Sequence, residues 1–196
     1  MGKPDREAQD AAVASPRLGP AAMISLALLT TAGAGATLSQ APVALWNTTP
    51  SEPEGLYLRS DQRPAPGAIV AFSLPPAAFA YADEAMPYLR RRSLLKAVAA
   101  GPGDLVCAGQ GGLAINGAHV APIAARDHLG RDLPHWNECR RLCADELFVF
   151  SARVPNSFDS RYFGPVRPTA VLGVYRLVAP AGGAARIERA TAGERG

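Results

Sequence analysis

The sequence predicts a mainly β domain with an antiparallel sheet, one short soluble helix and one amino-terminal transmembrane helix. Short apolar runs are separated by turn signals such as Pro-Gly, Gly-Pro-Gly-Asp and Asn-Gly, which is typical of antiparallel strands. Only one stretch of the soluble part has a helical composition, and residues 18–51 carry no charged side chain. With 196 residues, 48% of them hydrophobic and 19% charged, the chain suits one domain plus an apolar segment.

The amino-terminal region predicts a membrane anchor. Residues 1–20 are polar and suggest a disordered cytoplasmic tail, whereas residues 21–41 contain no proline and, at about 1.5 Å per residue, span roughly the 30 Å of a bilayer core. We therefore expect a transmembrane anchor, or uncleaved signal-anchor, over residues 21–44. A cleaved signal peptide is the main alternative, because Ala-Gly-Ala sequences resemble cleavage sites, and a buried soluble helix is a third.

A membrane anchor and a cleaved signal peptide would both export the part of the chain that follows the apolar segment. We accordingly expect a domain over residues 45–178 in the periplasm, attached to a bacterial inner membrane, and a flexible tail over residues 179–196. Turn signals separate several strands that we expect within this domain, and two more are expected from runs rich in Val, Leu, Phe and Tyr. The expected strands cover residues 67–72, 93–99, 105–108, 113–115, 118–120, 146–152 and 170–178.

Two local signals define the rest of the domain. Residues 77–92 are Ala-rich and carry aromatic side chains, which predicts the soluble helix, although Pro87 must break or kink it. Asn116 and Gly117 separate two short apolar runs, which predicts a hairpin with a type I′ turn. Residues 121–143 resemble a loop.

Charge and composition exclude one class of partner and single out one residue. The net charge of +3 comes from 20 basic and 17 acidic residues, a balance that argues against nucleic-acid binding. Of the 20 basic residues 18 are arginine, and the two lysines are Lys3 and Lys96. Lys3 lies in the polar tail, but Lys96 lies in an apolar run where a charge is poorly solvated.

The three cysteines predict at most one internal disulfide and one remaining thiol. Cys107 paired with Cys139 or Cys143 would close a loop of about 30 residues. The alternative is a zinc site that uses the three cysteines with His135 or His128. We favour the disulfide and expect no metal and no cofactor.

Three segments carry residues suited to catalysis. Ser51 lies between two prolines, which restrict its backbone and direct its hydroxyl, although the segment could also be a plain juxtamembrane linker. Burial of Lys96 would favour its neutral form, which can act as a general base where arginine cannot, unless it is an edge-strand lysine whose amine reaches water. Residues 154–165 form a polar cluster between two strands, which alone could be a hydrogen-bonded turn.

Together these segments resemble the type I signal peptidases, which use a serine/lysine dyad. The matching features are a serine just past an amino-terminal membrane segment, a strand lysine followed by Gly-Pro-Gly-Asp, and a late Ser-x-Asp-Ser-Arg-Tyr-x-Gly. The similarity covers residues 45–178 and is strongest to the TraF-type conjugative-transfer peptidases. The sequences that carry it are Ser-x-Pro-x-Gly-Leu-Tyr, Cys-Arg-Arg-Leu before Asp-Glu-Leu-Phe, and Ser-Phe-Asp-Ser-Arg-Tyr-Phe-Gly-Pro-Val.

The resemblance implies a signal-peptidase-like antiparallel β fold and assigns roles to six residues. Ser51 matches the nucleophile and Lys96 the general base, and the Thr49 hydroxyl with the Ser51 amide would bind the oxyanion. Ser157 matches a serine that orients the lysine amine, while Asp159 and Arg161 match an ion pair that shapes the site. The housekeeping enzymes have Met after the nucleophile and proline three residues on, whereas here Glu52 follows Ser51 and Pro53 comes two residues on. These differences favour a dedicated substrate over bulk preprotein processing.

The implied function is a membrane-anchored serine endopeptidase that processes an exported pilin-like subunit for conjugation or type IV secretion, by hydrolysis or cyclisation. The alternatives are a general signal peptidase acting on preproteins and a non-catalytic exported assembly factor. The expected partners are the substrate, inner-membrane lipid and the secretion machinery. Substrate is expected to bind as an added strand on a sheet edge. Arg90, Arg91 and Arg92 would form a solvated helix end, or contact lipid head groups or an acidic pilin segment.

Overall fold

The computed structural model describes residues 41–181, which belong to one compact unit. The expected cytoplasmic tail, nearly all of the expected anchor and most of the expected carboxy-terminal tail lie outside the described residues. Over residues 41–181, no helix is long and apolar enough to cross a membrane. Ala44, at the end of the expected anchor, is the first residue of strand β1.

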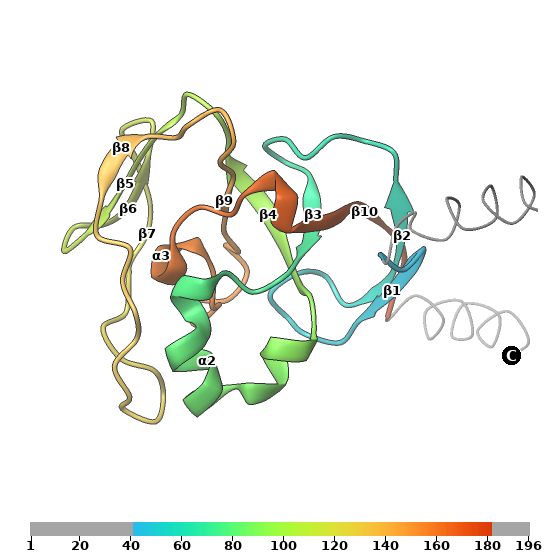
Figure 1. The fold of residues 1–196 in the computed structure, drawn as a ribbon, viewed down its shortest axis with the longest axis horizontal. Coiled ribbons are helices and arrows are strands. Elements are labelled where there is room, and N and C mark those ends of the chain that lie inside the picture. The colour runs from blue at the N-terminus through green and yellow to red at the C-terminus, as the bar shows by residue number, and fades with distance from the viewer. Residues whose placement is uncertain (1–40, 182–196) are drawn as a thin grey trace, which may run out of the picture. The chain divides into compact units, whose positions relative to one another are not determined.

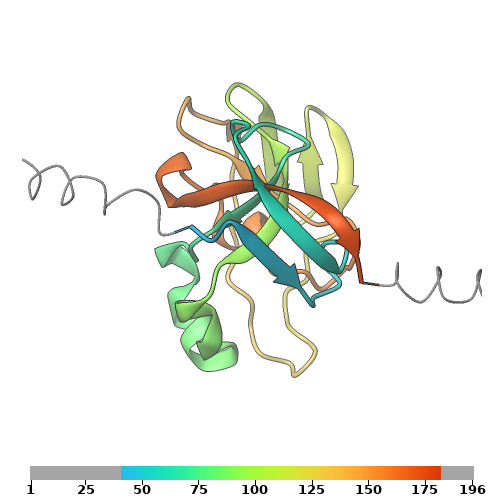
Figure 2. The ribbon, with the colours of Figure 1, turned by 90° about the vertical axis from the view of Figure 1, so that its right-hand side faces the viewer.

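The larger sheet has six strands, all paired antiparallel, and contains the longest strand of the domain (Figure 1). Their order across the sheet is β1 (Ala44–Asn47), β2 (Gly55–Ser60), β10 (Val171–Pro180), β3 (Ile69–Phe72), β4 (Leu94–Ala100) and β9 (Phe148–Val149). Strand β10 is rich in Val, Leu and Tyr, residues that suit a pleated and partly buried surface. It pairs with β2 on one side and β3 on the other, and Figure 2 shows it in red among the strands of this sheet.

The smaller sheet has four antiparallel strands in the order β7 (Ala118–Ala121), β6 (Gly112–Ile115), β5 (Leu105–Gly109) and β8 (Cys139–Arg141). The hairpin between β6 and β7 is confirmed. Asn116 and Gly117 have φ angles of 51° and 84°, the two positive values that a type I′ turn requires. This sheet follows β4 in the chain, after the turn at Gly101–Asp104.

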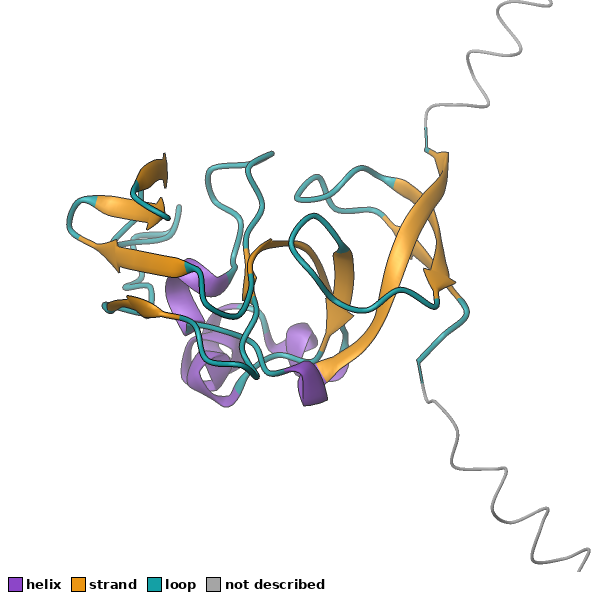
Figure 3. Cartoon of the chain, turned by 90° about the horizontal axis from the view of Figure 1, so that it is seen from above, coloured by secondary structure: helices purple, strands orange, loops and turns teal. Residues whose placement is uncertain are grey.

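Helical segments gather along one side of the domain (Figure 3). The expected helix over residues 77–92 is confirmed as a broken run, formed by η1 (Pro76–Ala78), α2 (Phe79–Ala85) and η2 (Pro87–Arg91). Met86 has φ −147° and ψ 58° and separates the last two, because the Pro87 ring disfavours a helical residue before it. A second helix, the single turn α3 (Ser160–Phe163), was not predicted, and η3 (Pro168–Ala170) precedes β10.

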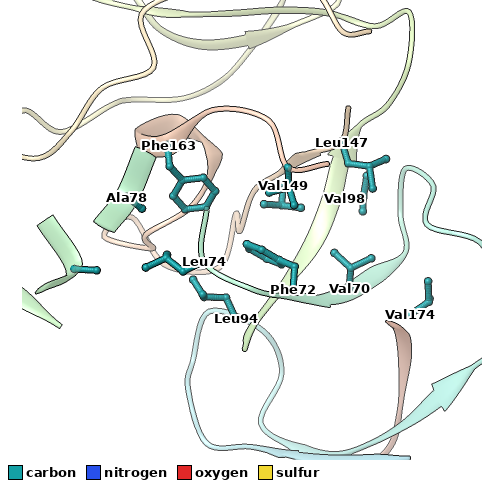
Figure 4. Packing of buried hydrophobic residues seen from close by; sticks show 12 residues of the cluster. Val70, Phe72, Leu74, Ala78, Leu94, Val98, Leu147, Val149, Phe163 and Val174 are labelled. Atoms are coloured by element: carbon teal, nitrogen blue, oxygen red, sulfur yellow. The ribbon is translucent and has the colours of Figure 1, made fainter. Parts of the chain in front are cut away.

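The main hydrophobic core lies between β3, β4, β9 and β10 and the segments η1, α2 and α3 (Figure 4). Alternate residues of β4 are buried, so Leu94, Val98 and Ala100 point to the same face as Lys96. Leu94 and Val98 belong to this core, while Ala100 belongs to a second cluster with Val106, Leu113 and Phe148 beside the smaller sheet. Strand β4 therefore contributes to both cores, and Lys96 lies between two residues of the main core.

Strands β5 and β8 are joined by the Cys107–Cys139 disulfide, and Cys107 and Cys139 are directly paired across the ladder. Cys143 is free and exposed. The prediction of one disulfide and one remaining thiol is thus confirmed, with Cys139 as the partner of Cys107. The disulfide uses two of the three cysteine sulfurs that the zinc alternative needs as ligands. Over residues 41–181, no group of three or more His, Cys, Asp or Glu side chains could hold a metal.

Several strand boundaries differ from the sequence-based expectation. Strands β1 and β2 were not predicted, and β8 lies inside residues 121–143, which were expected to be loop. The expected strand over residues 146–152 contains only Phe148–Val149. The physical reason is the same in each case, because these short segments are selected by their partners across the ladder rather than by their own composition.

Candidate active site

Ser51 lies in the tight loop between β1 and β2, and the side chain of Asn47 holds this loop together. Asn47 Nδ2 donates to the carbonyl oxygens of Thr49, Glu52 and Pro53 at 2.9, 3.0 and 3.0 Å. The Ser51 carbonyl accepts a hydrogen bond from the Ser151 hydroxyl, and Ser51 is only 8% exposed. Asn47 and Ser151 were missed from the sequence because their contribution is a set of hydrogen bonds to backbone brought close by folding.

The Pro-x-Gly-Leu-Tyr part of the motif after Ser51 builds the same loop. The Tyr57 hydroxyl donates to the Pro53 carbonyl at 2.8 Å, and the Tyr57 side chain is fully buried. Gly55 has a φ of +143°, and a side chain there would collide with the carbonyl of Ala179 on β10. Tyr57 and Gly55 therefore fix the shape of the loop that carries Ser51, and they take no part in the chemical step themselves.

Thr49, the residue matched to an oxyanion donor, is exposed two positions before Ser51. Its hydroxyl donates to Asn47 Oδ1 at 2.8 Å, and its backbone N–H donates to the same oxygen at 3.1 Å. The hydroxyl would have to turn away from Asn47 in order to donate to a substrate oxyanion.

Lys96 is 6% exposed and lies on the buried face of β4, so the alternative of an edge-strand lysine in water is wrong. Burial lowers the pKa of its amine from the usual lysine value of 10.5 because the charged form is poorly solvated. The carboxylates of Asp159 and Glu52 oppose this by raising the pKa, and the Arg161 guanidinium lowers it further. The net effect is a pKa below the usual lysine value, which is the direction that the sequence predicted for a buried lysine.

Glu52 belongs to the same loop as Ser51 and is buried with its carboxylate against β4, and it was not predicted to belong to the site. One carboxylate oxygen, Oε1, accepts a hydrogen bond of 2.9 Å from the backbone N–H of Ala97, the residue after Lys96. Glu52 is 5% exposed, and burial raises the pKa of its carboxyl group. The available signal was the replacement of an apolar residue by a charged one after the serine.

Asp159 and Arg161 form a fully buried ion pair, as the resemblance implied. Arg161 Nε and Nη2 donate to the two carboxylate oxygens of Asp159 at 2.8 and 3.0 Å. The remaining donors of Arg161 reach the carbonyl oxygens of Pro122, Pro155 and Ser157 at 3.0, 3.3 and 3.0 Å. Asp159 also caps α3, because its side chain accepts from the Arg161 backbone N–H.

Ser157 is held in place by this ion pair, and its hydroxyl is left without a protein partner. Its Oγ is the single buried side-chain oxygen or nitrogen atom over residues 41–181 with no hydrogen bond. A buried unpaired hydroxyl costs free energy, which points to a partner supplied by substrate or by a neighbouring amine. The unpaired hydroxyl is compatible with a serine that orients the lysine amine, and that role stays a prediction.

One groove brings the predicted residues together. A hollow of about 690 Å³ is lined by Ser51 and Thr49 from the β1–β2 loop, by Lys96 from β4 and by Ser157 from the loop before α3. These residues lie up to 108 positions apart in the chain, from Thr49 to Ser157. A serine hydroxyl, an amine whose pKa is lowered and an unpaired hydroxyl in one groove can support nucleophilic acyl transfer.

Comparison with known proteins identifies the family of this chain and several relatives. The sequence profile of "Signal peptidase, peptidase S26" matches residues 17–179. "Plasmid transfer protein TraF" of Escherichia coli is 36% identical over 144 residues, which cover 67% of this chain and 80% of that protein. "Probable conjugal transfer protein TraF" of Sinorhizobium fredii is 33% identical over 178 residues, covering 83% and 91%. The crystal structure of a signal peptidase I from Enterococcus faecalis is 23% identical, with a TM-score of 0.37, over 59% of this chain and 98% of that one.

The chain belongs to the peptidase S26 family, the signal peptidases, a family of serine peptidases. Within that family its curated relatives place it in the TraF-type branch.

Proposed function

We propose that this protein is a membrane-anchored peptidase that processes an exported pilin-like subunit for conjugative transfer, with Ser51 as nucleophile and Lys96 as general base. The observation that carries the proposal is the single groove lined by Ser51, Lys96 and Ser157, in which burial lowers the pKa of Lys96. The conjugation context rests on the TraF relatives, which are named as plasmid or conjugal transfer proteins. The anchor is the apolar segment at residues 21–44, which would place the catalytic domain in the periplasm.

The reaction proceeds by acyl transfer. Neutral Lys96 takes the proton of the Ser51 hydroxyl while its oxygen bonds to a peptide carbonyl carbon, and the carbonyl electron pair moves onto the oxyanion. The Ser51 N–H and the Thr49 hydroxyl stabilise this oxyanion, and loss of one such donor typically costs about a hundredfold or more in rate. The intermediate then expels the amine, which takes the proton from Lys96. Water or a substrate amine subsequently attacks the acyl-enzyme.

Strand β4 offers an edge on which substrate can bind beside Lys96. Strand β9 pairs with β4 only at Val98 and Ala100, so over the described residues the Leu94–Lys96 part of β4 has a strand partner on one side, β3. Leu94 and Leu95 also line the groove. A peptide added as a strand at this edge would place its carbonyl groups next to Ser51.

Substitution of the dyad tests the mechanism. Ser51→Ala and Lys96→Arg should each abolish processing while the protein still accumulates in the membrane, because neither variant retains both nucleophile and base. Western blotting of membrane fractions and of the substrate measures both quantities. Processing by either variant would reject the serine/lysine mechanism, and it would favour the non-catalytic assembly factor if another peptidase performs the cleavage.

The substrate and the product need separate measurements. Genes for a mating pore or a relaxase next to this gene would support a dedicated conjugative enzyme, whereas cleavage of many unrelated preproteins by the purified protein would favour a general signal peptidase. Mass spectrometry of the mature subunit decides between the two fates of the acyl-enzyme. A loss of one further water would show cyclisation, and a linear product would show hydrolysis.

A further inference from the structure

The charged side chains that line the catalytic groove are all cationic. They are Lys96 and, at the end of η2, Arg91 and Arg92, and no Asp or Glu lines the groove over the described residues. A second hollow of about 390 Å³ shares Arg91, Arg92 and Ser93 with the groove, and its charged lining is arginine alone. Positive charge is thus concentrated along the wall of the groove that lies next to β4.

Arg91 and Arg92 differ from their neighbour Arg90. Arg90 is already engaged, because its Nε lies 3.4 Å from Asp83 Oδ1 and its guanidinium lies 3.4 Å from the centre of the Phe79 ring. Arg91 and Arg92 are exposed and have no carboxylate partner in the part of the chain that the structure describes. Their charges therefore remain available to a molecule that enters the groove.

We propose that Arg91 and Arg92 form a subsite for acidic side chains of the substrate peptide, next to the scissile bond. The proposal rests on the proposed peptidase function and names the substrate class. A peptide that reaches Ser51 must pass through a groove of one charge sign, and complementary charge favours both its capture and its orientation. Trp46 and Tyr88, which are 61% and 59% exposed and line the same groove, can contact apolar residues of that peptide.

Matched peptides test this subsite. The full-length protein in detergent is given fluorogenic peptides with alanine before the scissile bond, in which Glu, Gln or Lys is placed at one flanking position at a time. At one or more positions kcat/KM should be about two- to fivefold higher for Glu than for Gln, and the ratio should shrink as salt screens the charges. The double variant Arg91→Gln, Arg92→Gln should lose this preference, whereas the control Arg90→Gln should keep it.

Three outcomes decide the proposal. Equal rates for Glu and Gln peptides at every position would overturn it, and so would a preference that survives in the double variant. Weaker binding of the double variant to phosphatidylglycerol vesicles, with no charge preference among peptides, would assign the arginines to lipid instead. In each case Ser51-dependent cleavage of the Gln peptide would leave the proposed peptidase function intact, so the two failures are distinguishable.

Glu52 carries a second, independent inference, which comes from its place on the edge of β4. The N–H and C=O of one strand residue face the same edge in an antiparallel ladder. The C=O of Ala97 accepts from the Phe150 N–H at 3.0 Å, and its N–H donates to Glu52 Oε1 at 2.9 Å. The Glu52 carboxylate thus continues the ladder where the backbone of β9 stops.

This contact joins the two candidate catalytic residues through their chain neighbours. Glu52 follows Ser51, Ala97 follows Lys96, and both Glu52 and Lys96 are buried. We infer that Glu52 is a positioning residue, which docks the Ser51 loop onto β4 and so sets the approach of the Ser51 hydroxyl to the Lys96 amine. The inference rests on the proposed function of this pair.

The charge of Glu52 also acts on Lys96. Glu52 and Asp159 face Lys96 with negative charge and Arg161 faces it with positive charge, while Arg153 acts on Glu52 itself. Removal of the Glu52 charge should therefore lower the pKa of Lys96 and shift the acidic limb of kcat/KM to lower pH. A purely structural contact would not move this limb.

Two substitutions separate the effect of the hydrogen bond to Ala97 from the effect of the negative charge. Glu52→Ala removes the hydrogen bond and the charge, and a small displacement of the nucleophile should lower kcat by about tenfold to a hundredfold. Glu52→Gln keeps an oxygen acceptor for the Ala97 N–H, so it should recover most of kcat while its acidic limb moves to lower pH. The control Glu54→Gln changes an exposed glutamate of the same loop and should leave both quantities unchanged.

A variant Glu52→Ala with the kcat and pH profile of the native protein would overturn the inference, even if it unfolds at a lower temperature. If Glu52→Ala does not fold, an unshifted acidic limb in Glu52→Gln would overturn the coupling to Lys96. If either of these results is found while Ser51→Ala loses all activity, only the inference about Glu52 fails, and the proposed peptidase function is retained.

Discussion

Lys96 occupies a strand position that alternation assigns to an apolar side chain. Its neighbours on the same face of β4, Leu94 and Val98, belong to the main core. An arginine at this position would keep its charge under all conditions, whereas a buried lysine can become neutral. Of the 20 basic residues in the chain 18 are arginine, and Lys96 lies at a position where the proposed reaction needs an amine that can lose its proton.

The first prediction at this scale concerns pH. If Lys96 must be neutral to accept the Ser51 proton, kcat/KM rises as pH passes upward through the pKa of Lys96, which burial lowers below 10.5. The acidic limb of the pH profile should therefore have its midpoint below 10.5. Steady-state cleavage of a fluorogenic peptide across the pH range measures it, and a midpoint at or above 10.5 would contradict the prediction.

The second prediction concerns the buried ion pair. Asp159→Asn leaves the Arg161 guanidinium, which is 1% exposed, without its countercharge, and this should lower the free energy of unfolding by about 3–5 kcal/mol. Asp145→Asn breaks the exposed pair with Arg167 and should cost less than about 1 kcal/mol. Urea denaturation of both variants gives the comparison. Equal losses in the two variants would show that burial of the Asp159 pair has no special effect.

At the scale of elements, the short strand β8 depends on its partner. It has three residues, and its pairing with β5 includes the covalent link between Cys139 and Cys107. The arginines that flank this link are also engaged, since Arg140 contacts Glu146 at 2.6 Å and Arg141 donates to the Gly103 carbonyl at 2.7 Å. Composition alone does not mark such a strand, because its stability comes from these contacts.

The third prediction follows from the disulfide. Its two cysteines are separated by 32 positions, and the chain-entropy relation assigns about 3–4 kcal/mol to a loop of that length. Cys139→Ser should lose a large part of this in denaturant unfolding, whereas Cys143→Ser should change stability by less than about 0.5 kcal/mol. Intact-mass alkylation of the native protein should find one reactive thiol. Three reactive thiols would reject the disulfide.

At the scale of the whole domain, two sheets and the helical segments meet around β4, and ionised carboxylates hold several of the connecting loops. Arg140 lowers the pKa of Glu146 to about 2. Tyr81 and Arg131 both bond to the Asp127 carboxylate, whose pKa is also lowered, and thereby tie α2 to the loop before β8. These loops join elements that share no strand pairing.

The fourth prediction is a loss of stability in acid. The folded-state pKa of Glu146 lies below its ordinary value of 4.5, so its contribution is present above about pH 4.5 and is lost as pH falls toward 2. The free energy of unfolding should therefore decline over this window, and Glu146→Gln should reduce the decline. Denaturation at stepped pH measures both curves. If the free energy of unfolding falls with pH in the same way in the native protein and in Glu146→Gln, Glu146 does not contribute to the loss of stability in acid.

The sequence by itself determined the antiparallel β class, the Asn116–Gly117 hairpin and the break at Pro87, and it gave the burial of Lys96 as one of two alternatives. It could do so because alternation, turn chemistry and proline geometry act over a few neighbouring residues. The same local signals, together with a family resemblance, were enough to select four further residues. Ser51 and Ser157 line the groove, and Asp159 and Arg161 form the buried ion pair.

Only the tertiary structure decided the partner of Cys107, the strands β1, β2 and β8, and the roles of Asn47, Ser151 and Glu52. Each of these depends on a contact with a segment distant in the chain or with backbone that folding brings near, as in the bond from the Glu52 carboxylate to the Ala97 N–H, 45 positions apart. No local pattern encodes such a bond. It exists because β9 ends early and leaves the Ala97 N–H without a backbone partner on the edge of β4, which is a property of the assembled sheet.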